Sequence, residues 1–153
     1  MTERAIDTNL LVALIDEKDK WHPTAVKLKD AMLSSSASLV YCDCVINEAI
    51  GVIGRRTEEQ KRQNQFSKLQ SGLTLSVTEE SITWISYHVE RLFPHIMNQC
   101  LSTEGRLNFN DALIGLFCQE TGIQFIASFD QDFDQMVWLK RIASAEQFQS
   151  LVN

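Results

Sequence analysis

Four acidic residues occur where their type and surroundings suit metal chemistry. Asp7, Glu48 and Asp111 are embedded in apolar stretches, and Asp130 closely follows a fourth apolar stretch. Burying a carboxylate is costly unless it is paired or binds a cation. Mg²⁺ and Mn²⁺ prefer oxygen ligands, which carboxylates supply. Together the four acids favour a divalent-metal site over four separate structural roles.

Each acid also has a structural interpretation. Asp7 could cap a following helix, and Asp111 could be a first-turn acid stabilised by the helix dipole. Asp130 could be a turn residue. Glu48 fits such a role least, because it is expected in the middle of a helix on a partly apolar face.

Strands alternate with helices along the chain, which is typical of a parallel sheet covered on both faces. We expect strands at 4–7, 38–42, 73–77, 123–127 and 137–142. Helices are expected at 10–16, 24–33, 44–56, 57–70, 111–120, from 144 onward, and from 78 to a break or kink at Pro94. Sites in such sheets form beyond the carboxyl ends of the strands, where Asp7 and Asp130 are expected.

Helix starts are predicted from capping residues. Thr8 or Asn9 is expected to cap the first helix, Asp43 the helix 44–56, and Asn110 the helix 111–120. Residues 57–60 match a capping box, which predicts a new helix there.

Composition restricts the class of protein. The 153 residues carry a net charge of −6, which argues against coating nucleic acid by bulk charge. Length and a 44% hydrophobic content predict a single domain over 1–153. The longest apolar run, 10–15, is too short to span a membrane, and no signal peptide is visible, so we expect a cytoplasmic protein with reduced cysteines.

The motifs around these acids resemble those of PIN-domain nucleases. Residues 6–11 (IDTNLL) resemble the opening motif of that family, and Glu48, Asp111 and the stretch 128–133 resemble its later motifs in the same order. The similarity is strongest to small VapC-like toxin ribonucleases. It implies a three-layer α/β/α fold with a central five-stranded parallel sheet. It also implies a metal-dependent endoribonuclease, the toxin of a type II toxin–antitoxin pair.

The resemblance also implies roles for individual residues. The four acids would be catalytic and hold one or two Mg²⁺ or Mn²⁺ ions. Asp132 would be an extra ligand, or else a solvated turn acid. Asn9 would orient the first aspartate, or cap a helix, and Ser128 replaces the commoner threonine while keeping a hydroxyl.

RNA, an antitoxin and a second copy of the chain are the expected partners. Arg55 and Arg56, with Lys61 and Arg62, could form a basic rim that contacts RNA phosphates, or simply be solvated charges. Trp21 and Trp84 could be exposed anchors. The resemblance suggests a homodimer with a groove for an antitoxin helix.

Three other functions remain open. The chain could be a non-catalytic PIN-like module that binds RNA or protein, or a solitary RNA-processing nuclease. A metal phosphohydrolase for small molecules ranks lower, because the stretch 7–9 (DTN) lacks the second aspartate expected of a phospho-aspartate enzyme. A histidine-based mechanism is unsupported, because all three histidines lie outside the acidic motifs.

Overall fold

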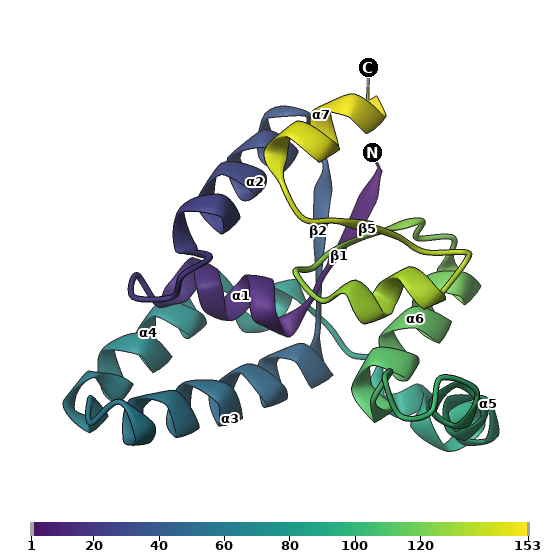
Figure 1. Cartoon of the computed structure of the whole chain (residues 1–153), viewed down its shortest axis with the longest axis horizontal. Helices are drawn as coiled ribbons and strands as arrows, with labels where there is room; N and C mark the ends of the chain where they lie inside the picture. The colour runs from purple at the N-terminus through teal and green to yellow at the C-terminus, as the bar shows by residue number, and fades with distance from the viewer. Residues whose placement is uncertain (1, 153) are drawn as a thin grey trace.

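A five-stranded parallel sheet forms the centre of the computed structural model, which describes residues 2–152 (Figure 1). The strand order is β3-β2-β1-β4-β5, with every neighbouring pair parallel. This confirms the predicted fold class. The strands are β1 (Glu3–Ile6), β2 (Ser38–Cys42), β3 (Ile82–Thr83), β4 (Phe125–Ala127) and β5 (Lys140–Ile142).

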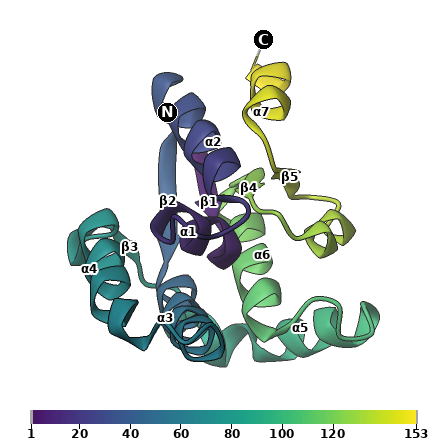
Figure 2. The same ribbon diagram turned by 60° about the vertical axis from the view of Figure 1, so that its left-hand side comes forward.

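In the described part of the chain, seven α-helices flank the sheet (Figures 1 and 2). They are α1 (Thr8–Ile15), α2 (His22–Ser34), α3 (Asp43–Glu59), α4 (Phe66–Ser76), α5 (Val89–Ser102), α6 (Phe109–Thr121) and α7 (Ala145–Val152). Helices α2 and α7 pack together toward the amino-terminal ends of β1 and β2, whereas α3 begins at the carboxyl end of β2 (Figure 1). Within residues 2–152, no helix is long and apolar enough to cross a membrane.

The predicted strand at 73–77 is wrong, because this segment is the end of α4 and the start of the following loop. Leu73 is 3% exposed and Leu75 is 82% exposed, although a strand would place both on the same face. Leu69 and Leu73, one helical turn apart, are the buried pair. Gly72 continues the helix, and a Cβ there would lie 3.3 Å from Ile15, so glycine permits close packing of α4 on α1.

The predicted helix starts at 57 and 78 are also wrong. Helix α3 continues to Glu59, and the Thr57 hydroxyl donates to the Gly54 carbonyl inside it. Residues 79–88 form two short 3₁₀ turns around the two-residue strand β3, and α5 begins only at Val89. The Asp43 carboxylate stabilises this segment, because it accepts the Ile85 N–H at 2.9 Å.

Three caps differ from the predictions. Asp7, rather than Thr8 or Asn9, is the N-cap of α1, and its carboxylate accepts the Thr8 N–H, which confirms its structural interpretation as a helix cap. Asn108, not Asn110, caps α6. Cys42 occupies the N-cap position of α3, because the helix already includes Asp43. Helix α6 ends at Thr121, one residue after the predicted end, where Gly122 adopts the left-handed conformation (φ 79°).

Candidate functional site

The carboxyl edge of the sheet brings the four predicted acids together. Asp7 follows β1, Asp130 follows β4, Glu48 lies in the second turn of α3, and Asp111 lies in the first turn of α6. All four line one cavity of about 140 Å³. Helix α6 runs antiparallel to the strand that it precedes, so its first turn reaches the same edge as the strand ends. The predicted convergence of these residues is therefore observed.

A single hydroxyl fixes Asp7 and the loop that carries Asp130. The Ser128 Oγ donates to Asp7 Oδ2 at 2.6 Å and accepts the Asp130 N–H at 2.9 Å. The other Asp7 oxygen accepts the Thr8 N–H at 2.7 Å. Ser128 is fully buried, so water does not replace these bonds. The two strand ends are thereby tied to each other at the cavity.

Asn9 orients the same loop from α1. Its Oδ1 accepts the Phe129 N–H at 3.1 Å, and its Nδ2 donates to the Ser128 Oγ at 3.3 Å. The amide therefore reaches Asp7 through the Ser128 hydroxyl. Asn9 lies inside α1 and does not cap it, which corrects the capping interpretation.

The first turn of α6 positions the other two acids. Asp111 Oδ2 accepts the Asn108 N–H at 3.0 Å, and Asn108 Oδ1 accepts the Asp111 N–H at 2.9 Å, which forms a capping box. Asn110 Nδ2 donates to Glu48 Oε2 at 3.3 Å. Sequence reasoning missed both asparagine roles. The three-residue spacing from Asn108 to Asp111 is the signal that could have revealed the first.

Burial and mutual repulsion disfavour ionisation of two of these acids. Desolvation raises the pKa of Asp7 to about 6, and the charges of Glu48 and Asp130 add to the rise, against the hydrogen bonds from Ser128 and Thr8. Desolvation also raises the pKa of Asp111 to about 7, helped by the other three carboxylates. A cation in the cavity would relieve both effects.

The donor set fits a hard divalent cation. Four carboxylates supply oxygen ligands, and none of the four forms an ion pair within residues 2–152. Arg56 also lines the cavity, but its guanidinium pairs with Asp19. In the described part of the chain, no three Asp, Glu, His or Cys side chains lie close enough together to form a ready-made cluster of metal ligands. A hard divalent ion can bind such a site through one or two carboxylates and water molecules.

Several predicted residues lie elsewhere. Asp132 lies in the turn after β4, where its N–H donates to Asp130 Oδ1 at 2.9 Å, and its side chain does not line the cavity. Arg55 is exposed and does not line this cavity, unlike Arg56. The prediction that Arg62 belongs to a basic rim is wrong, because this side chain is buried and pairs with Asp16 at 2.8 Å.

Comparison with known protein families decides the assignment. Residues 5–139 match the PIN domain. The chain belongs to the PIN-domain family. No curated protein sequence matches it. Among solved structures it is similar to VapC20 of Mycobacterium tuberculosis, described as a sarcin–ricin loop cleaving toxin, with a TM-score of 0.63 and 17% identity over 86% of this chain and 92% of that one. At this identity the similarity shows the fold.

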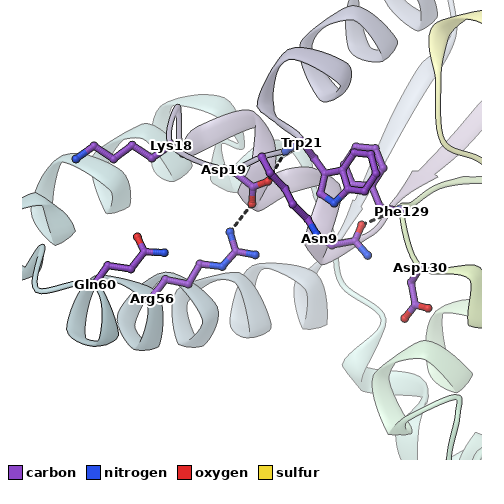
Figure 3. A pocket seen from close by; sticks show the side chains of 9 residues that line it. Asn9, Lys18, Asp19, Trp21, Arg56, Gln60, Phe129 and Asp130 are labelled. Atoms are coloured by element: carbon purple, nitrogen blue, oxygen red, sulfur yellow. Dashed lines mark hydrogen bonds and ion pairs between the residues drawn. The ribbon is translucent and has the colours of Figure 1, made fainter.

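A second cavity of about 560 Å³ adjoins the acidic one in this PIN domain. It lies between the connection from α1 to α2, the end of α3 and the loop after β4 (Figure 3). Trp21 and Phe129 stack at one side, with ring centroids 4.8 Å apart. Asn9, Arg56 and Asp130 line both cavities, so the two form one continuous surface.

Proposed function

We propose that this PIN domain is a metal-dependent endoribonuclease that hydrolyses RNA phosphodiester bonds and acts as the toxin of a type II toxin–antitoxin pair. The observation that carries the proposal is the convergence of four carboxylates without cationic partners on one small cavity, within residues 2–152. The described activity of VapC20, which shares the fold, supports the choice of RNA as substrate.

In this proposal Asp7, Glu48, Asp111 and Asp130 hold one or two Mg²⁺ or Mn²⁺ ions. A divalent ion bound there would lower the pKa of a water molecule and stabilise the leaving oxygen. Ser128 and the capping box of α6 hold the carboxylates in place, which reduces the reorganisation needed for binding. Asp132 contributes through its N–H, which donates to Asp130 Oδ1, rather than through its carboxylate.

The expected protein partners remain part of the proposal. Helix α5 exposes Phe93, Met97 and Leu101, which are spaced four residues apart and are 50%, 47% and 78% exposed. This stripe suits contact with a protein, such as an antitoxin helix or a second copy of the chain. Trp84 is also half exposed, as expected for an anchor.

Replacing Asp7 with asparagine tests the nuclease assignment. We expect the variant to lose RNA cleavage in Mg²⁺ or Mn²⁺ while its circular dichroism spectrum stays unchanged, because asparagine keeps the shape but not the charge. Asp30→Asn, on the exposed face of α2, is the matched control and should cleave normally. Cleavage by the Asp7 variant at the wild-type rate would contradict the mechanism.

One observation favours a second candidate, a non-catalytic PIN-like binding module: no three carboxylates in residues 2–152 already form a ligand cluster. Calorimetry with Mn²⁺ separates the two candidates. The nuclease proposal expects binding that is weakened in Asp111→Asn. The absence of detectable binding at millimolar Mn²⁺ would favour the module.

A further inference from the structure

We propose that the larger cavity is a nucleobase subsite, in which one unpaired base of single-stranded RNA stacks on Trp21 beside the cleavage site. The inference rests on the proposed nuclease function and adds to it a specific way of holding the substrate. It makes Trp21 a binding residue outside the acidic motifs.

The aromatic pair forms a rigid stacking platform. Trp21 and Phe129 are nearly parallel, with an interplanar angle of 14° (Figure 3). Trp21 is 42% exposed although it has this aromatic neighbour. A backbone bond from the Trp21 N–H to Asp19 Oδ1, at 2.7 Å, fixes the loop that carries it. Bases stack on such exposed rings without strong sequence preference, because every base has a π-face.

The platform is continuous with the acidic site. Phe129 lies between Ser128, which holds Asp7, and Asp130, which lines both cavities. In Figure 3, Asp130 lies beyond the aromatic pair, on the side opposite Lys18. A nucleotide carries its base and its phosphate on one ribose. A phosphate at the acidic site therefore brings a neighbouring base to this cavity.

The rest of the lining suits a nucleotide better than an apolar ligand. Lys18, Lys20 and Arg56 contribute three cationic side chains to a chain whose net charge is −6. Two carboxylates also line the cavity: Asp19, which pairs with Arg56, and Asp130 at the junction with the acidic site. The Lys20 ammonium lies over the Trp21 ring, 5.4 Å from its centroid. In the proposal a base replaces it on that ring, and the flexible lysine side chain swings aside to meet a phosphate.

The opposite end supplies hydrogen bonds and enough space. Gln60 follows Arg56 by one helical turn and lines the end of the cavity away from Trp21, with Arg56 between them (Figure 3). Its amide can both donate to and accept from the adjoining nucleotide of the strand. A volume of about 560 Å³ lies within the usual range for small-molecule sites. Single-stranded RNA, whose bases can be splayed out, is the substrate class that this arrangement fits.

Fluorescence anisotropy with two labelled probes tests the subsite. One probe is a uridine decamer, and the other is a decamer of abasic units with the same phosphates. EDTA in the buffer removes divalent ions, so metal-dependent cleavage does not interfere. We expect wild-type protein to bind the uridine decamer more tightly. Trp21→Ala should weaken that binding by about 5- to 150-fold and leave binding of the abasic decamer unchanged.

Three variants serve as controls. Tyr87→Ala removes an exposed aromatic ring that lines neither cavity, and should bind both probes normally. Trp21→Phe should retain most of the preference for bases. If Trp21→Ala does not fold, Trp21→Leu keeps an apolar contact with Phe129 but removes the aromatic face, and should also lose the preference.

Two outcomes would overturn the subsite: equal affinity of wild-type protein for both probes, or equal weakening of both probes by the Trp21 variants. A separate cleavage assay in Mn²⁺ distinguishes this failure from failure of the proposed function. If the wild-type protein cleaves RNA but binds both probes equally, the nuclease proposal stands and the subsite proposal is refuted. If binding depends on Trp21 and on the bases but no RNA is cleaved, the subsite proposal stands and the nuclease proposal is refuted.

Discussion

Replacing Asp111 with asparagine should stabilise the metal-free protein at pH 8 while weakening its response to metal. Asp111 is 7% exposed, and burial raises its pKa from 3.8 to about 7. At pH 8 the folded protein therefore carries a buried negative charge beside three other carboxylates. Asparagine has nearly the same shape, and its Oδ1 can still accept the Asn108 N–H that completes the capping box.

The pKa difference sets the magnitude and the pH range. At 1.36 kcal/mol per pKa unit, the ionised carboxylate costs at most about 4 kcal/mol of folding free energy at pH 8. Rotation of the side chain toward water lowers this ceiling to about 2 kcal/mol, or about 4–8 °C in Tm for a chain of this size. Because the pKa is higher in the folded state, the wild-type protein is stabilised below about pH 4 and loses that stability as the pH rises through about 7.

Thermal unfolding in EDTA between pH 4 and pH 8 measures the effect. We expect the variant to gain stability over the wild type progressively across this range. Adding Mn²⁺ at pH 8 should raise the Tm of the wild type more than that of the variant, because ligand binding stabilises the folded state. The exposed Asp30→Asn variant should show neither difference. A variant that is no more stable than wild type at pH 8 would refute the reasoning.

Three further substitutions test the supports of the site and the core by urea unfolding. Ser128→Ala removes the hydroxyl that joins two aspartates and should cost about 1–3 kcal/mol, whereas Ser128→Thr should retain most of the stability. Arg62→Met leaves its buried aspartate partner without a counter-charge and should cost about 3 kcal/mol, whereas the exposed Arg55→Met should change stability by less than about 0.5 kcal/mol. Gly115→Ala places a Cβ against the side chain of the buried Met136 and should cost about 1–3 kcal/mol, which Met136→Ala should partly restore. Unchanged midpoints for these variants would show that the contacts carry little free energy.

Local sequence spacing is sufficient to predict the central strands and the position of the acids. The predicted strand 38–42 has the observed bounds of β2, and the predicted first strand matches β1 within one residue. Because parallel strands end at one edge, residues that follow them are expected to meet there, as Asp7 and Asp130 do. The apolar neighbours of Glu48 and Asp111 along the chain are enough to identify both as carboxylates that are costly to bury.

The third strand could not be predicted in this way. Leu73, Leu75 and Val77 alternate as a strand would, yet the segment through Ser76 is helical because Leu69 and Leu73 pack in the core at helical spacing. The true strand, β3, has two residues, which is too short to show any period. Pairing with the end of β2 defines it, and that pairing joins residues about 40 positions apart.

The sequence by itself determined which side chains were available for chemistry and which edge of the sheet would carry them, because both depend on residue type and local period. Only the tertiary structure decided which other residues contact these side chains and hold them in position. The Ser128 hydroxyl reaches Asp7 across 121 positions, and Phe129 meets Trp21 across a similar separation. Such contacts depend on how distant segments pack against one another, and no local pattern encodes that packing.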